Sequence, residues 1–393
     1  MIGSLNGYRY APDAPAGLVA KIADPAIRVV SLTITEGGYG IDPATGEFTA
    51  ESDDIQADLR ADTPNQTAFG IVLQAMRLRR ARGDGALTIM SCDNIQHNGS
   101  VARAAFLGFA ERKDPGLARW MREHIAFPSS MVDRVTPGTL DADRAYLERA
   151  YGYWDRSPVT CEPFCQWVLE DTFAAGRPPL EDAGVDIVTD VEPYELMKLR
   201  LANGTHQALC YFGYLLGHRY VHEAINDPDI QALVLRYIDE EAVPTLRPIR
   251  GVDPRAYGRA VIKRFGNPEI QDPLTRICAD TSDRIPKFLL PVVTAQLELG
   301  GPVQQCATVV ASWARYAEGV DEQGRPIDVV DPRRDTLMAA ARQQQSKPTA
   351  FIGDSSVFGD LAKSPRFARD YADALERIRL KGARVALREL AAT

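Results

Sequence analysis

The stretch 67–92, TAFGIVLQAMRLRRARGDGALTIMSC, shows the pattern on which the first half of the chain is built. Residues 67–83 have the apolar spacing of an amphipathic helix, and Gly83 is a typical helix end. The run ALTIMSC follows at once and has the length of a buried strand. A strand-like run at 27–35, IRVVSLTIT, and a helical segment at 100–114 continue the alternation. Strand, helix, strand, helix indicates parallel strands joined by crossover helices.

The second half of the chain has a different pattern. A further strand candidate lies at 184–191, and beyond it helical periodicity dominates. We therefore predict an α/β plus all-α protein, with a truncated Rossmann-type parallel-sheet domain at 1–190 and a mostly helical domain at 191–393. The helical segments expected in the second domain are 194–218, 228–240, 254–265, 286–298, 302–318, 334–344 and 365–390.

The composition is that of an ordinary globular protein. The chain has 393 residues, of which 45% are hydrophobic and 25% charged, with a net charge of −8. The negative charge argues against a nucleic-acid surface, and no apolar run approaches the roughly 18 residues of a membrane span. The first residues lack the apolar core of a secretory signal, and the six cysteines are scattered. These features favour reduced thiols in a cytoplasmic protein.

The usual dinucleotide-binding motif is not found. A GxGxxG must follow a strand and open a helix, because bare glycine backbone and the helix N-terminus hold the pyrophosphate. The GxG at 83–85 lies between a helix and a strand, which is the reverse order, and EGGYG at 36–40 has the wrong spacing. No GxxxxGK[ST] is present either.

The segment 194–209, YELMKLRLANGTHQAL, combines a helical pattern with several reactive side chains. On an ideal α-helix Asn203 would lie about 140° around the axis from Lys198, and His206 about 80°. Glu195 lies one turn before Lys198. Lys198 is thus either a surface lysine paired with Glu195, or a desolvated lysine suited to act as a general base. The spacing alone leaves both interpretations open.

Polar residues also gather directly after a predicted strand. The stretch 91–100, SCDNIQHNGS, places Asn94, His97 and Asn98 at the carboxyl end of a parallel strand, where α/β sheets bind ligands. The structural alternative is a loop in which Asn98 or Ser100 caps the next helix.

Two further clusters have simple structural interpretations. Asp133 and Arg134, in FPSSMVDRVTP, form either an ion pair or part of a site. His218 and His222 have the HxxxH spacing of metal ligands on a helix, but no third ligand is evident. We therefore interpret this pair as helix-surface residues and predict no metal site.

Five motifs, in this order, resemble one known family: TITEGGY, SCDNxxHNG, MVDRxTP, EPFxQWVxED and KLRxxNxxH. They are similar to those of the mannitol dehydrogenases, the polyol-specific long-chain dehydrogenases. The resemblance runs from about residue 2 to the C-terminus. It implies a zinc-independent oxidoreductase that uses NAD, with NADP as the open alternative. The implied reaction interconverts a polyol such as mannitol and a ketose such as fructose.

The resemblance also implies roles for individual residues. Lys198 would be the catalytic base that removes the hydroxyl proton. Asn94 and Asn203 would donate hydrogen bonds to the developing alkoxide. His206 would hold and orient the substrate oxygen, and Glu195 would pass the proton onward to water.

Three more residues match family positions around the two ligands. Glu36, in TEGGY, would lie near the nicotinamide end of the coenzyme, and Asp133, in MVDR, also near the coenzyme. Arg276, in LTRICAD, would contact the substrate, together with Asn94 and His206.

The chain departs from the family at its start. Family members begin with a Gly-rich strand–turn–helix unit, whereas MIGSLNGYRYAPD matches an internal family segment. We therefore expect the N-terminal part of the coenzyme domain to be missing, either through a misplaced start or by true truncation. The alternatives to a mannitol 2-dehydrogenase-like enzyme are another polyol dehydrogenase, a hexuronate reductase of this family, or a catalytically silent sugar-binding remnant.

Overall fold

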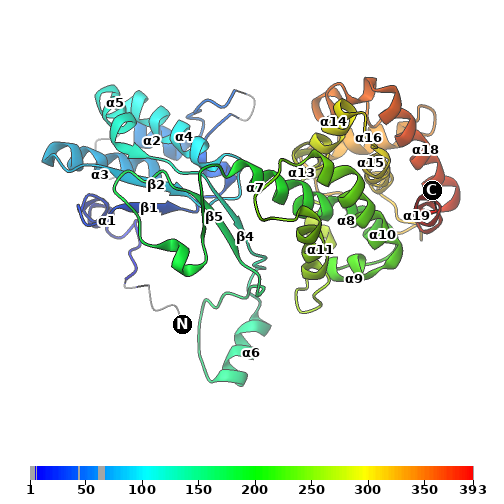
Figure 1. Ribbon diagram of the computed structural model, residues 1–393, viewed down its shortest axis with the longest axis horizontal. Helices are drawn as coiled ribbons and strands as arrows, with labels where there is room; N and C mark the ends of the chain where they lie inside the picture. Colours follow the sequence, from blue (N-terminus) through cyan, green and yellow to red (C-terminus); the bar gives the residue numbers. More distant parts are fainter. Residues whose placement is uncertain (1–4, 6, 43–44, 61–66, 393) are drawn as a thin grey trace. The chain divides into compact units, whose positions relative to one another are not determined.

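The computed structural model describes residues 5, 7–42, 45–60 and 67–392, with the side chain of Glu36 excepted. The chain divides into two compact units, whose elements are labelled in Figure 1. The first unit comprises Met1–Arg134 with Cys165–Glu192, and the second comprises Val135–Phe164 with Pro193–Thr393.

A parallel sheet of three strands forms the centre of the first unit. Its order is β1 (Val29–Leu32), β2 (Leu87–Ser91) and β3 (Ile125–Ala126), with both pairs parallel. All five residues of β2 are buried, as expected for a strand covered on both faces. The helices around this sheet are α1 (Pro15–Ile22), α2 (Asp53–Arg60), α3 (Ala68–Arg82), α4 (Asn98–Lys113) and α5 (Pro115–His124).

The boundaries of α3 follow from its end residues. The Thr67 side chain accepts a hydrogen bond from Gly70 N–H at the start of the helix. At the end, Gly83 adopts φ +72°, a left-handed conformation that glycine takes without strain. The helix, the following strand and the parallel crossover predicted from 67–92 are confirmed.

A second sheet of three strands in the same unit was not expected. Its order is β4 (Ser130–Asp133), β5 (Gln166–Glu170) and β6 (Asp186–Val188). β4 and β5 run antiparallel, whereas β5 and β6 run parallel. These strands have only three to five residues each, too few for a clear alternation of apolar and polar side chains. Of the three, the sequence indicated only β6.

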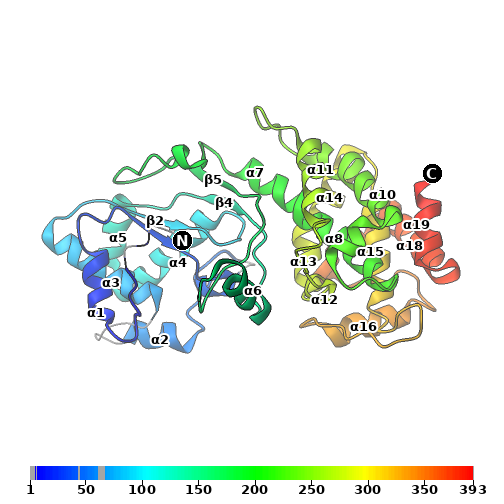
Figure 2. The ribbon, with the colours of Figure 1, turned by 90° about the horizontal axis from the view of Figure 1, so that it is seen from below.

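The second unit is mostly helical, and α8 (Gly204–Leu215) runs through its middle (Figures 1 and 2). α8 packs against α9, α10, α12, α13 and α15. The other helices of the unit are α6 (Asp141–Tyr151), α7 (Glu192–Met197), α9 (Val221–Asn226), α10 (Pro228–Arg236), α11 (Pro254–Phe265), α12 (Leu274–Ile277), α13 (Thr281–Phe288), α14 (Leu290–Leu299), α15 (Gln304–Tyr316), α16 (Arg334–Gln343), α17 (Ser355–Phe358), α18 (Pro365–Lys381) and α19 (Ala383–Ala391).

Two π-helical turns and four 3-10 turns complete the list of elements. The π-turns are η3 (Lys198–Asn203), between α7 and α8, and η4 (Tyr237–Ala242), directly after α10. The 3-10 turns are η1 (Glu36–Tyr39), η2 (Leu180–Ala183), η5 (Val243–Thr245) and η6 (Leu361–Lys363).

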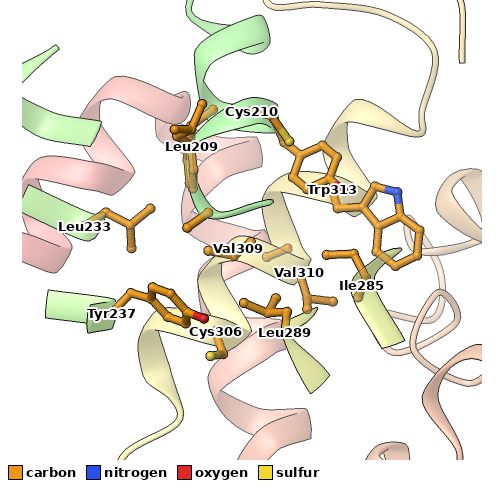
Figure 3. Close-up of a cluster of buried hydrophobic side chains, with 14 of the residues drawn as sticks. Leu209, Cys210, Leu233, Tyr237, Ile285, Leu289, Cys306, Val309, Val310 and Trp313 are labelled. Atoms are coloured by element: carbon orange, nitrogen blue, oxygen red, sulfur yellow. The ribbon is translucent and has the colours of Figure 1, made fainter. Parts of the chain in front are cut away.

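The core of the second unit gathers side chains from most of its helices. Figure 3 shows Leu209, Leu233, Leu289 and Val309 around this core, with Trp313 and Tyr237 at its edges. Trp313 and Tyr237 are both completely buried. Such dense apolar packing makes α8 a rigid support for the residues that it carries.

The two units are not separated by a single cut in the sequence. The units change at Glu192/Pro193, but the second unit also includes Val135–Phe164. A buried ion pair between Glu162 and Arg264 of α11 holds this segment to the helical unit. The long helical segment expected at 365–390 is also divided, because Gly382 separates α18 from α19 with φ +85°.

Among the described residues, no helix combines the length and apolar character needed to cross a membrane. All six cysteines are free thiols, and Cys210, Cys278 and Cys306 are buried.

Candidate functional site

A π-helical turn brings three predicted site residues to one side of a helix. Lys198 and Asn203 are the first and last residues of η3, and His206 lies in the first turn of α8. Each backbone hydrogen bond of a π-helix spans five residues, so Lys198 and Asn203 lie one turn apart. Asn203 and His206 are three residues apart, which also places them on one face. The 140° separation holds only for an ideal α-helix, whereas the turn from Lys198 to Asn203 is π-helical.

Lys198 is not a surface residue. Only 8% of its surface is exposed, and Glu195, one turn earlier in α7, is 5% exposed. Both residues have polar or charged contacts within the protein. Lys198 and Glu195 are therefore not an exposed surface pair, because both residues are buried. A buried amine is the environment that a general base requires, since burial disfavours the charged form.

The side chains of Asn203 and His206 differ in how they are held. The Asn203 side-chain oxygen is buried and has no hydrogen-bond partner among the described residues. Unsatisfied buried polar atoms are rare in folded proteins and often mark functional sites. The His206 ring, in contrast, stacks on Phe265 with centroids 3.9 Å apart and planes 6° apart. This contact fixes the orientation of the imidazole.

A small hollow of the second unit lies beside His206, with a cavity volume of about 10 Å³, which is the room needed by about one water molecule. Its wall is mixed, with an imidazole, a guanidinium and a carboxylate among apolar side chains. The lining residues are Val135, His206, Val221, Arg264, Phe265, Ile270 and Asp272.

Two ion pairs shape this hollow. Asp272 accepts two hydrogen bonds from Arg276, with Nε–Oδ1 at 2.6 Å, and this contact raises the pKa of Arg276 despite partial burial. Arg264 and Glu162 also form a two-fold contact, with Nη2–Oε1 at 2.7 Å and Nε–Oε2 at 3.0 Å. The Arg264 guanidinium lies 3.8 Å from the centre of the Phe164 ring. The predicted substrate residue Arg276 is thus held next to the hollow by Asp272.

In the first unit, Asn94 begins the loop that follows β2. Its neighbour Asp93 accepts hydrogen bonds from the N–H groups of Ile34 (3.0 Å) and Thr35 (2.9 Å), and from the Tyr39 hydroxyl (2.7 Å). Burial is the main cause that raises the pKa of Tyr39. Asp93 thereby ties the loop with Asn94 to the turn that follows β1.

This end of the sheet also contains strained backbone. Thr35, in the turn after β1, has φ +67°, and His97, in the loop after β2, has φ +55°. Residues other than glycine seldom adopt such angles, and those that do cluster at functional sites. Both strained residues lie beyond the carboxyl ends of parallel strands, where α/β sheets bind ligands.

The remaining candidate residues have the following places. Glu36 begins η1, and its side chain lies outside the described part of the structure. Asp133 is the last residue of β4, opposite Gln166 of β5. Asn98 donates to the Ser130 carbonyl at 2.8 Å and accepts from Ser130 N–H at 2.9 Å. Asn98 therefore links α4 to β4 and does not act as a helix cap.

The HxxxH pair is divided between two environments. His218 hydrogen bonds to the Asp227 carboxylate through Nε2 at 3.0 Å. Nδ1 of His222 is buried and has no partner among the described residues. No group of three metal-ligating side chains occurs within the described ranges.

The sequence interpretation missed Asp93, Asp272, Tyr237 and the Glu162–Arg264 pair. Asp93 and Glu162 lie within the quoted motifs, so their positions were available. Their partners are 59 and 102 residues away in the chain, and no local pattern indicates such pairings.

Both halves of the chain match the models of one protein family. The model of the mannitol dehydrogenase Rossmann domain matches residues 1–182, and that of the mannitol dehydrogenase C-terminal domain matches residues 190–379. The chain is 41% identical to a mannitol 2-dehydrogenase of Phaeosphaeria nodorum, over 100% of this chain and 69% of that protein. It is 43% identical to a mannitol 2-dehydrogenase of Aspergillus fumigatus, over 97% of this chain and 77% of that protein.

Solved structures give the same result. A Pseudomonas fluorescens mannitol 2-dehydrogenase, in a ternary complex with NAD and D-mannitol, matches with a TM-score of 0.84 at 41% identity, over 100% of this chain and 80% of that one. A substrate-free D-sorbitol dehydrogenase matches with a TM-score of 0.88 at 37% identity, over 98% and 80%. The expectation of a missing N-terminal part of the coenzyme domain is not supported by these comparisons. The predicted fold class is confirmed, and the chain belongs to the mannitol dehydrogenase family.

Proposed function

We propose that the protein interconverts a polyol and a ketose of the mannitol and fructose type, by hydride transfer with NAD and with Lys198 as the general base. Membership of the mannitol dehydrogenase family makes the protein a polyol dehydrogenase. The related Pseudomonas fluorescens enzyme was solved with NAD and D-mannitol. The observation that carries the proposal is the burial of Lys198 and Glu195 on the helix that also holds Asn203 and His206.

The first unit fits NAD at the carboxyl ends of β1 and β2. The turn after β1 is strained at Thr35, and a side chain added at Gly37 would meet no atom within 4 Å. This open, glycine-containing turn leaves room for a flat ring to approach the backbone. The coenzyme supplies the acceptor for the hydride that leaves the alcohol carbon. We propose that Glu36 and Asp133 are the residues that hold it.

The proposed chemistry requires a base and hydrogen-bond donors at one oxygen. An alcohol that loses hydride is left with a negative oxygen unless its proton is removed. Lys198 would take this proton, and Glu195 would pass it onward to water. Asn94 and Asn203 would donate hydrogen bonds to the developing alkoxide, which are strongest where water is excluded.

Substrate orientation would come from the second unit. The His206 ring, held by Phe265, would bind a substrate hydroxyl in one defined position. Arg276, held by Asp272, would add a donor to other hydroxyl groups of the chain. This donor set contains no group specific to a particular polyol, so the substrate must be found by measurement.

The test begins with the complete chain. Fluorescence titration with NADH measures coenzyme binding, and a spectrophotometric screen of mannitol, arabinitol, sorbitol and fructuronate identifies the substrate. Lys198→Ala should lower kcat by about 10²- to 10⁴-fold while NADH binding stays unchanged. Lys287→Ala is the matched control, because the Lys287 side chain is 52% exposed and pairs with Asp283 on the surface.

Three outcomes would contradict the proposal. Near-normal turnover of Lys198→Ala would exclude the general-base role. Absence of NADH binding by the folded chain would instead support the silent sugar-binding alternative. Preference for fructuronate over every polyol would favour the hexuronate reductase.

A further inference from the structure

The π-turn at 198–203 changes the backbone hydrogen bonds around the candidate base. The N–H of Gly204 donates to the carbonyl of Leu199, five residues earlier, and bypasses the carbonyl of Arg200. A bypassed carbonyl inside a protein needs another donor, because an unpaired buried polar group destabilises the fold. The Tyr237 hydroxyl provides it and lies 2.6 Å from the Arg200 oxygen.

Tyr237 is well suited to this contact. It is completely buried, and burial raises its pKa well above the ordinary value, so the hydroxyl stays protonated and can donate. Gly204 supplies the necessary room, because a methyl group at this position would overlap the Tyr237 hydroxyl. The Tyr237 hydroxyl can therefore occupy this place only because residue 204 has no side chain.

The second π-turn of the unit follows the same rule. In η4 the N–H of Val243 donates to Ile238, five residues earlier, and bypasses Asp239. The bypassed carbonyl of Asp239 accepts from Arg255 Nη2 at 3.2 Å. In both π-turns a side chain from another helix thus satisfies the carbonyl that the helix leaves open.

We propose that Tyr237 is a positioning residue of the dehydrogenase reaction, whose hydroxyl maintains the π-turn that places Lys198 and Asn203 on the side of His206. Tyr237 is not proposed to touch the substrate or the coenzyme. Without its hydroxyl, the Arg200 carbonyl is satisfied by α-helical pairing with Gly204, and Lys198 turns away from Asn203. This inference rests on the proposed function for its kinetic consequences, but its structural consequence is independent of any activity.

The kinetic test compares two tyrosine variants of the full chain. Tyr237→Phe should lower kcat for the polyol by about 10- to 100-fold, the loss typical of a reacting group displaced by about 1 Å. The KM for NAD should stay unchanged. The apparent pKa in the pH profile of kcat should shift, because the surroundings of Lys198 change.

The matched control is Tyr211→Phe. Tyr211 is also completely buried, lies in α8 and donates to the Gln207 side chain at 2.8 Å, but it contacts no π-turn carbonyl. Tyr211→Phe should lower the free energy of unfolding, measured in urea, by about as much as Tyr237→Phe does. It should leave the pH dependence of kcat unchanged.

The structural test is a crystal structure of Tyr237→Phe. The expected result is a hydrogen bond from Gly204 N–H to the Arg200 carbonyl in place of Leu199. A retained π-turn in this variant, or an equal loss of kcat in Tyr211→Phe, overturns the proposal.

Two further readouts keep the test decisive. If Tyr237→Phe does not fold, Gly204→Ala provides the second variant, because its methyl group must displace the same hydroxyl and should lower kcat in the same way. If the wild-type chain shows no dehydrogenase activity, the proposed function fails, whereas the change of hydrogen bond at Gly204 still tests the role of Tyr237.

Discussion

Loss of either partner of the Arg264–Glu162 pair should destabilise the second unit by about 3–5 kcal/mol, the range for breaking a buried ion pair. The two side chains are 9% and 2% exposed, so water can neither screen the charges nor replace the missing partner. Glu162 also accepts the N–H of Val135 at 2.7 Å. Glu162→Gln removes the carboxylate that pairs with the buried guanidinium, and Arg264→Met removes the guanidinium that pairs with the buried carboxylate.

The assay is a double-mutant cycle measured by urea unfolding. The double variant Glu162→Gln/Arg264→Met should lose clearly less than the sum of the two single losses, because both charges of the pair are then removed together. The surface pair between Lys287 and Asp283 is the control. It also has a 2.7 Å contact, but its side chains are 52% and 58% exposed, so each single loss there should stay below about 1 kcal/mol.

The same variants should change the segment Val135–Phe164. This segment belongs to the second unit, and α6 within it has no buried residue, so the ion pair is a main attachment. Limited proteolysis should therefore cut it faster in Glu162→Gln than in wild type. Losses equal to those of the surface pair, with unchanged proteolysis, would refute the reasoning from burial.

Three further predictions concern other buried or paired carboxylates. Burial raises the pKa of Glu241 to about 7, although it accepts the N–H groups of Gln305 and Cys306. The folded state then holds a proton that the unfolded state releases above about pH 4.3. The free energy of unfolding should therefore fall as pH rises from about 4.3 to 7. Glu241→Gln should flatten this pH dependence, measured by urea unfolding. Asp272→Asn should raise the KM for the polyol by up to about tenfold, with a smaller change in kcat. The reason is that Arg276 loses the carboxylate that accepts its two hydrogen bonds. Steady-state kinetics will measure this, with Asp283→Asn as the control. Asp93→Asn should lower the free energy of unfolding of the first unit by about 1–3 kcal/mol, since an amide has one acceptor oxygen where the carboxylate binds three donors, and the cost will be seen in thermal unfolding.

The parts of the fold with a strong local pattern could be predicted from the sequence. The segment 254–265 is α11, because its apolar spacing and its Asp253 cap act within one helix. Gly83 ends α3 as expected, since its role depends only on its own backbone angles. β4 and β5 could not be predicted in this way, because each is a few residues long and is stabilised by a partner more than 30 residues away.

The candidate site was only partly accessible for a related reason. That Lys198, Asn203 and His206 belong to one helix follows from local periodicity. The alignment of these three residues depends on the π-turn. The π-turn is itself maintained by the Tyr237 hydroxyl, which lies 37 residues beyond Arg200 in the chain. Similarly, the burial of Lys198 is a property of the packed second unit, whereas spacing alone left the surface and the desolvated interpretation open.

The π-turn between α7 and α8 also has a consequence for how this helix can vary. Such a turn contains one residue more than the α-helical path it replaces, so the flanking helices keep their faces toward the core whether or not the extra residue is present. Deleting a single residue from 198–203 would leave the apolar side of α8 where it is and would rotate the residues of the turn, Lys198 among them. The chemistry of the turn can therefore change through a change of length that leaves the core side chains of α8 in place.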